Sequence, residues 1–136
     1  MKSFLILFAL TLLTGCASVS ARKVTPIEPF QHIFVVERLN DNYRVHEFLV
    51  AELRRHGYDA SSGPLTMMPE NAQALLTYDA RWEWDFQNYL IELYLEIHTT
   101  HSQKKLAEAR YYQPSIRPNP VSVVARRVID KLLAKP

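Results

Sequence analysis

The 136-residue sequence has one cysteine, three glycines and no concentrated excess of charge of either sign. A single cysteine cannot form a disulfide within the chain, and three glycines leave no glycine-rich loop for a phosphate group. The 16 basic and 14 acidic residues nearly balance, so the sequence lacks the basic field that nucleic-acid binding needs. We therefore predict no nucleic-acid partner and no bound cofactor.

Long apolar runs are also scarce, and the pronounced one lies at the amino terminus. Residues 4–13 are apolar except for Thr11, and Lys2 precedes them. This run is shorter than the ~20 residues that a membrane-spanning helix needs. A basic start followed by a short apolar core is typical of a secretory signal. We therefore predict that residues 1–15 are a signal peptide.

The apolar run ends in Leu13-Thr14-Gly15-Cys16, which resembles the lipobox of bacterial lipoproteins. In that family, signal peptidase II cleaves before the cysteine, whose thiol receives the lipid. The resemblance implies a mature protein that carries palmitate-type acyl chains on Cys16 and is held by them at a membrane. Aspartate after the cysteine usually marks retention at the inner membrane, whereas this chain has Ala17. The expected location is therefore the periplasmic side of the outer membrane.

The remaining residues divide into a short linker and a globular part. Residues 16–29 contain serines, basic residues and two prolines without an apolar period, which predicts a lipidated tether. The chain as a whole is 48% hydrophobic and 22% charged, as is usual for a globular protein. We therefore expect residues 30–136 to form a single domain.

Residues 75–87 contain both tryptophans and keep a two-residue period throughout. Their even-numbered positions are apolar: Leu76, Tyr78, Ala80, Trp82, Trp84 and Phe86. This alternation predicts a long, half-buried β-strand. Both indoles are expected to form the floor of the core, where aromatic side chains bury a large apolar area.

Similar patterns define the other elements. Residues 90–99 and 105–112 also alternate, and the short links predict a three-stranded antiparallel meander with residues 75–87. The β-branched run at residues 31–37 predicts another strand. Apolar stripes at helical spacing predict helices over about residues 42–56 and 120–134. The sequence therefore predicts an α/β fold of the α+β type, a two-layer sandwich with both helices on one face of a mixed sheet.

Matching the apolar faces of the meander gives a register for its strands. Pairing Trp84 with Leu93 aligns the first two strands, and pairing Leu95 with Tyr111 aligns the second and third. Because side chains alternate between faces, the same register also predicts which polar side chains meet on the opposite face.

That polar face holds the candidate functional residues. Its charged side chains are predicted to form two rows across the sheet: Arg81, Glu96 and Arg110 in one, and Asp79, His98 and Glu108 in the other. Tyr94 and Tyr112 are predicted to lie side by side, and aromatic side chains are common contact residues. The first row and the two tyrosines are therefore our candidate interaction surface.

The second row suggests an alternative function, a small-ligand-binding or hydrolytic protein. Asp79 and Glu108 beside His98 could raise the pKa of the histidine and create a proton-transfer group. Catalytic groups usually lie in concave pockets, whereas an open sheet face is flat and wet, so we expect no enzymatic activity. His98 and His101 supply only two ligands, so no metal site is expected.

Residues 77–85, 90–97 and 106–111 resemble small proteobacterial lipoproteins, and the resemblance covers most of residues 30–134. It implies an envelope lipoprotein without implying a particular activity. The order of elements is also similar to accessory envelope domains such as the peptidoglycan-synthase activator LpoB and the amino-terminal domain of TolB, an analogy of fold. Because those domains act through protein contact, we expect a non-enzymatic, lipid-anchored domain whose partners are the membrane and an envelope protein.

Overall fold

The computed structural model describes residues 16–84, 86–114 and 119–135, so the predicted signal peptide lies outside the described residues. The elements that it contains are β1 (Ser18–Lys23), β2 (His32–Val36), α2 (Val45–Arg55), β3 (Asp59–Gly63), η2 (Leu65–Met67), β4 (Ala74–Trp84), β5 (Asn88–Thr99), β6 (Lys105–Tyr112) and α3 (Val121–Leu133). The strands and helices predicted from residue 31 onward are all present, with ends shifted by a few residues. No helix in the described part of the chain has the length and apolarity to span a membrane.

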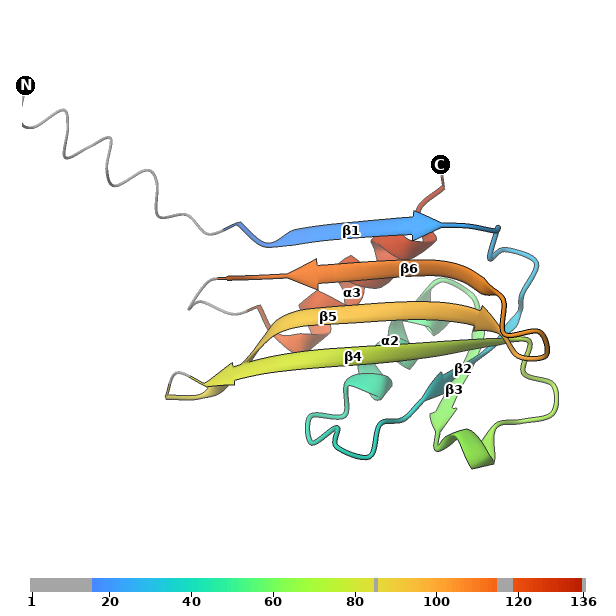
Figure 1. The fold of residues 1–136 in the computed structure, drawn as a ribbon, viewed down its shortest axis with the longest axis horizontal. Coiled ribbons are helices and arrows are strands. Elements are labelled where there is room, and N and C mark those ends of the chain that lie inside the picture. Colours follow the sequence, from blue (N-terminus) through green and yellow to red (C-terminus); the bar gives the residue numbers. More distant parts are fainter. Residues whose placement is uncertain (1–15, 85, 115–118, 136) are drawn as a thin grey trace, which may run out of the picture.

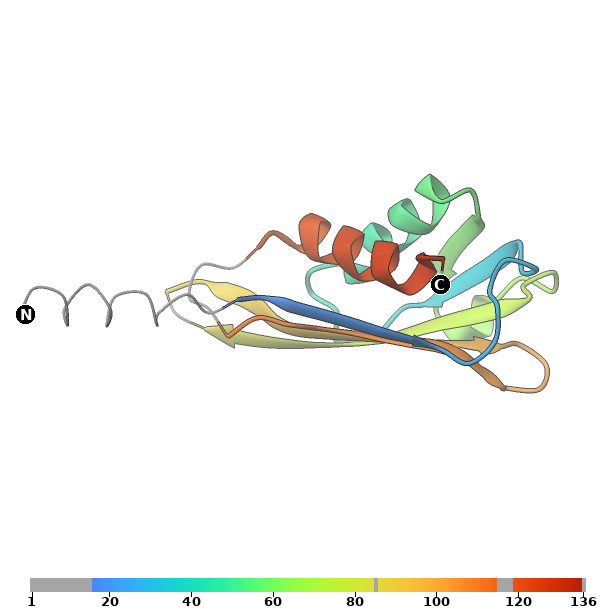
Figure 2. The same cartoon turned by 90° about the horizontal axis from the view of Figure 1, so that it is seen from above.

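The six strands form one mixed sheet in the order β1-β6-β5-β4-β2-β3. Strand β2 runs parallel to β3 and β4, while the other neighbouring pairs are antiparallel. Both helices lie on the same face of the sheet (Figures 1 and 2). The predicted two-layer α+β sandwich is therefore confirmed.

Helix α2 is flanked by Asp41 before its first turn and by Gly57 after its last turn. Asp41 Oδ2 accepts a hydrogen bond from the backbone N–H of His46 in the first turn, at 3.4 Å. At the other end, Gly57 has φ +91°, a left-handed conformation that glycine adopts without steric cost. The N–H of Tyr58 then donates to the carbonyl oxygen of Leu53 at 3.1 Å, which closes the helix.

The segment predicted to be a tether instead contains β1, an edge strand of the sheet. It pairs with β6 from Ser18 opposite Tyr112 to Lys23 opposite Ala107. Val19 and Ala21 point toward the core and pack against its edge. The pairing with β6 and the packing of these two side chains together hold β1 at the edge of the sheet.

The second correction concerns the tryptophans. Tyr78 is buried and Trp82 is half-buried against Tyr43, with ring centroids 4.0 Å apart, but Trp84 is 67% exposed and Phe86 is 91% exposed. The prediction that both indoles form the floor of the core is therefore wrong for Trp84. The reason is geometric, because the end of β4 extends beyond the first turn of α3 (Figure 2), where the helical layer no longer covers it.

The strand register also differs from the predicted one. Trp84 pairs with Asn88 rather than Leu93, and Leu95 pairs with Ala109 rather than Tyr111. The shift is two residues between β5 and β6 up to Ile97, and between β4 and β5 it is four residues up to Arg81 and five beyond the irregularity between Arg81 and Trp82. Where the shift is even, side chains keep their predicted face. The neighbours on the polar face nevertheless change.

The core provides a direct test of the two-layer arrangement. Leu95 in β5 is fully buried, whereas Leu39 in the loop before α2 is fully exposed. We expect Leu95→Ala to lower the free energy of unfolding by about 2–5 kcal/mol, because it removes buried methyl groups and leaves a cavity. Leu39→Ala should change it by less than ~0.5 kcal/mol. Urea unfolding measures both, and equal effects would contradict the placement of β5 in the core.

Candidate functional site

The sheet face opposite the helices carries a compact polar network on β5 and β6, which we call the Tyr94 cluster (Tyr94, Glu96, Lys105 and Glu108). Lys105 Nζ lies 2.8 Å from Glu96 Oε1 and 2.8 Å from Glu108 Oε2. The hydroxyl of Tyr94 lies 2.7 Å from Glu96 Oε1 and 3.0 Å from Glu108 Oε2, and its single hydrogen is shared between these acceptors. One lysine and one tyrosine therefore hold two like charges together.

A second network, which we call the Glu92 cluster, lies beside it toward the β4–β5 turn. Glu92 accepts a hydrogen bond from Arg110 Nε at 2.8 Å and forms an ion pair with Arg81 Nη2 at 3.2 Å. The guanidinium of Arg110 also lies over the ring of Tyr112, 5.4 Å from its centroid. The carboxylate of Glu92 therefore links β4, β5 and β6 across this face.

Strand β1 completes the surface at its edge. Arg22 Nε lies 3.4 Å from Glu108 Oε1. A shallow depression of about 220 Å³ lies over β1, β6 and β5 and is lined by Ser20, Ala21, Arg22, Tyr94, Glu108, Ala109 and Arg110. We did not identify Arg22 from the sequence because it falls in the predicted tether. The alternation of polar and small apolar residues over residues 18–23 is the sequence feature that indicates a strand there.

The electrostatics of the Tyr94 cluster keep its groups in fixed charge states near neutral pH. The hydrogen bonds from Lys105, and then from Tyr94, lower the pKa values of Glu96 and Glu108. Contacts with the same carboxylates raise the pKa of Lys105. Desolvation, followed by the hydrogen bonds to both carboxylates, raises the pKa of Tyr94 to about 12. Since each pKa moves away from neutrality, these groups are poor candidates for proton transfer.

The structure brings only part of each predicted row together. Arg81 and Arg110 both contact Glu92 instead of Glu96. Tyr94 is opposite Arg110 rather than Tyr112. The predicted interaction residues therefore remain on one face but have different neighbours.

The alternative active face is not assembled. Asp79 is paired with Tyr94, and its carboxylate forms an ion pair with Arg38 at 3.2 Å. His98 is opposite Lys105, while Glu108 is opposite Glu96. Asp79, His98 and Glu108 thus occupy three different rows of the sheet. Among the described residues, moreover, there is no group of three or more His, Cys, Asp or Glu side chains that could hold a metal ion.

A buried polar cluster under the start of α2 was not predicted. The hydroxyl of Tyr78 donates to Asp41 Oδ2 at 2.5 Å, and His46 Nδ1 lies 3.3 Å from the same oxygen. The Asp41 side chain is only 4% exposed. Burial alone would raise the pKa of Asp41, but the hydrogen bonds from Tyr78 and His46 outweigh it and lower the pKa. This cluster attaches the loop before α2 to β4, which is a structural role.

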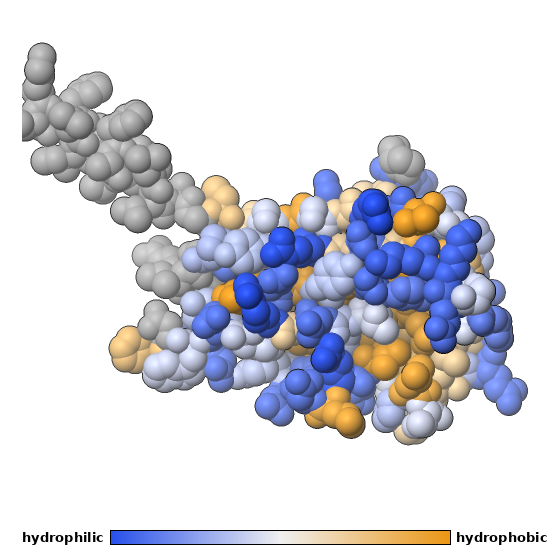
Figure 3. All heavy atoms as spheres, viewed as in Figure 1, coloured by the Kyte–Doolittle hydropathy of each residue, from blue (hydrophilic) through white to orange (hydrophobic). Residues whose placement is uncertain are grey.

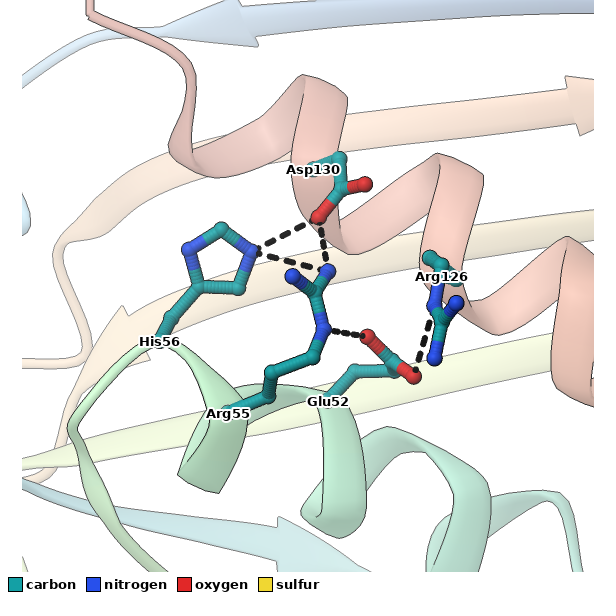
Figure 4. A network of polar contacts seen from close by, with 5 residues as sticks. All are labelled: Glu52, Arg55, His56, Arg126 and Asp130. Atoms are coloured by element: carbon teal, nitrogen blue, oxygen red, sulfur yellow. Dashed lines mark hydrogen bonds and ion pairs between the residues drawn. The ribbon is translucent and has the colours of Figure 1, made fainter.

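A fourth polar cluster joins the two helices on the outer surface (Figure 4). Glu52 of α2 bonds to Arg55 at 2.6 Å and contacts Arg126 of α3 at 3.4 Å. Asp130 of α3 bonds to Arg55 and lies 2.7 Å from His56 Nε2. Because every carboxylate in it is paired with a cation of the neighbouring helix or of its own, we assign this cluster to helix packing.

The buried Asp41 predicts a pH-dependent contribution to stability. Its folded-state pKa lies below the ordinary value of 3.8, so its stabilising effect is present above that value and is lost as the pH falls through the folded-state pKa. Asp41 accepts on both oxygens, from the N–H of Tyr43 at Oδ1 and from Tyr78 and His46 at Oδ2, so in Asp41→Asn the amide NH2 must face one of these donors. We expect it to lower the free energy of unfolding at pH ~7 by about 1–3 kcal/mol.

The measurement is urea unfolding of both proteins at neutral pH and below the ordinary pKa of aspartate, where the difference between them should shrink. Asp79→Asn is the matched control, since the Asp79 side chain is 72% exposed. It should change stability by less than ~0.5 kcal/mol. An Asp41→Asn protein as stable as the parent at neutral pH would contradict the assigned role.

No protein-family model and no curated protein matches this chain. Its fold is similar to that of a PelC dodecamer from Paraburkholderia phytofirmans, with a TM-score of 0.63, 16% identity, and coverage of 87% of this chain and 95% of that chain. A PDZ domain protein from Parabacteroides distasonis matches with a TM-score of 0.50 and 10% identity over 89% of this chain and 37% of that one. TolB from Acinetobacter baumannii matches with a TM-score of 0.49 and 13% identity over 85% of this chain and 30% of that one. At these identities the similarity to PelC establishes a shared fold.

Proposed function

We propose that this chain is a non-enzymatic, lipid-anchored lipoprotein of the cell envelope that faces the periplasm and binds an envelope protein. In this proposal, residues 1–15 are removed and Cys16 carries the acyl chains. The outer membrane is the proposed location, because Ala17 follows the cysteine. The sheet face with the Tyr94 and Glu92 clusters is the proposed contact surface.

The anchor is supported by the sequence around Cys16, and the position of this residue determines what an anchor there would do. Cys16 is exposed and lies two residues before the start of β1. Two residues of extended chain span at most ~7 Å. An acylated Cys16 would therefore hold the first strand close to the membrane surface.

The observation that carries the contact role is the one-sided covering of the sheet. Both helices occupy one face, and Figure 3 shows the opposite face, where polar surface predominates with apolar patches between. On that face Tyr94 and Tyr112 are half-buried beside the exposed Arg110. Tyrosine and arginine are enriched at protein interfaces.

Two further points favour protein contact over chemistry on this face. The pKa shifts in the Tyr94 cluster move its groups away from neutrality, and the three residues of the alternative active face lie in separate rows. The similar PelC structure is a dodecamer, so a domain of this fold can form protein contacts. We therefore do not extend the proposal to hydrolysis or small-ligand binding.

The anchor is tested by Cys16→Ser in the full chain expressed in a double-membrane bacterium. Because the thiol is the acceptor of the lipid, this variant should lose labelling by a fatty-acid analogue and should move from the detergent phase to the aqueous phase. Ser18→Ala, at the exposed start of β1, is the control and should keep both properties. Labelling that persists in Cys16→Ser would disprove acylation at this residue.

The contact surface is tested by photo-crosslinking in cells. A photoreactive phenylalanine analogue replacing Tyr112 should give a discrete crosslinked species, since this residue lies on the proposed surface beside Arg110. Arg110→Ala should reduce that species about tenfold or more, the usual scale for a central arginine. Arg127→Ala removes another exposed arginine, from helix α3, and should leave the yield unchanged. Equal effects of the two substitutions, or no crosslink, would contradict the proposal.

A further inference from the structure

The end of the β4–β5 hairpin and the start of β1 lie at the same end of the molecule. Ser18 is opposite Tyr112, which is opposite Glu92 of β5, and Glu92 is opposite Arg81 of β4. Strands β1 and β4 therefore run in opposite directions, so Cys16, which precedes β1, lies at the same end of the sheet as the last residues of β4. Figures 1 and 2 agree in placing the two segments at one end.

The hairpin end carries an exposed aromatic pair, which we call the aromatic tip (Trp84 and Phe86). Trp84 is 67% exposed and Phe86 is 91% exposed, with ring centroids 5.9 Å apart. Phe86 also has φ +59°, a left-handed conformation that is uncommon for a bulky residue. Large apolar side chains are thus held outward at a position where glycine or asparagine would suit the backbone better.

Packing within the domain does not account for this arrangement. Trp82, two residues earlier, is stacked on Tyr43, so the hairpin is anchored to the fold before the tip begins. Both aromatic side chains of the tip expose apolar surface to water, which is unfavourable. A surface that covers the tip would recover this free energy.

We propose that the aromatic tip inserts into the interface of the bilayer that holds the acyl chains of Cys16. This inference rests on the proposed function, because the lipid anchor identifies which surface faces the end of the hairpin. Indole rings favour the headgroup region of a bilayer, and a phenylalanine beside one can reach the acyl boundary. The occupant is a lipid surface, since the proposed acylation site lies at the same end as the tip.

Two attachment points would fix how the domain is oriented. Strands β1 and β4 are separated by β6 and β5, so at about 4.8 Å between neighbouring strands the two points lie roughly 14 Å apart across the sheet. Acyl chains alone allow rotation about the anchor, whereas a second contact opposes it. The strands would then point away from the bilayer, and the polar face would be presented sideways to partners.

The two tryptophans of the chain make the test specific. Trp82→Phe leaves Trp84 as the sole tryptophan, and Trp84→Phe leaves Trp82 as an internal reference. The chain from Cys16 onward, which contains every described residue, is reconstituted in phosphatidylcholine vesicles brominated near the headgroup end of the acyl chains. We expect Trp84 fluorescence to shift to the blue and to be quenched at least about twofold more strongly than that of Trp82.

A matched probe tests whether exposure alone causes quenching. Met67 is an exposed apolar residue of η2, which follows β3 at the other edge of the sheet from β1. Met67→Trp with Trp82→Phe and Trp84→Phe should give a tryptophan that bromine does not quench. Equal quenching of the probes at positions 67 and 84 would overturn the proposal.

The experiment separates failure of the tip from failure of the anchor. Cys16 is the single cysteine, so protein that is not acylated in cells can be coupled through its thiol to a lipid with a maleimide headgroup. If the protein is not acylated in cells but Trp84 is strongly quenched on the maleimide lipid, the proposed anchor is contradicted and the tip proposal is not. Trp84 quenched no more than Trp82 on either anchor would overturn the tip proposal. A blue-shifted Trp84 without bromine quenching would also overturn it and would assign the tip to a second copy or another protein.

Discussion

The structure depends on an apolar layer between one face of the sheet and two amphipathic helices. Leu76, Leu93, Leu95 and Ile97 are fully buried in this layer, and helix α3 contributes Val128, Ile129 and Leu132. Because strand side chains alternate, burying one face leaves the other exposed. The paired charges on the uncovered face therefore follow from the same alternation that builds the core.

That alternation made the layers predictable from the sequence, but it did not determine the register. A slip of two or four residues keeps every apolar side chain on the core face, so several registers satisfy the hydrophobic pattern equally well. The register shifts at Arg81/Trp82 and Ile97/His98 and the lengths of the turns decide among them. The prediction placed Asp79, His98 and Glu108 on the correct face of the sheet. It was wrong in making them neighbours across the strands. The residues of a candidate site on a sheet face can therefore be identified only when the strand register is known.

The other two errors arose because burial depends on what lies above a strand. Residues 18–23 have weak apolar character, yet β6 offers them a free edge and helix α3 lies close to them, so they join the sheet. Trp84 has strong apolar character, but the helical layer stops before it. A sequence pattern gives the face on which a residue lies, while the extent of the covering layer is a tertiary property. Val19 is partly covered and Trp84 is exposed for this reason.

The placement of β1 changes what a lipid on Cys16 would do. A tether through residue 29 would let the domain move far from the bilayer, at up to ~3.5 Å per residue. Because β1 begins at Ser18, only Ala17 separates the proposed acylation site from the sheet. A short link restricts the domain to a few orientations, and the end of the β4–β5 hairpin then lies where a bilayer would be. The polar face runs along the length of the strands, so a partner could reach it from the side while the domain remains at the membrane.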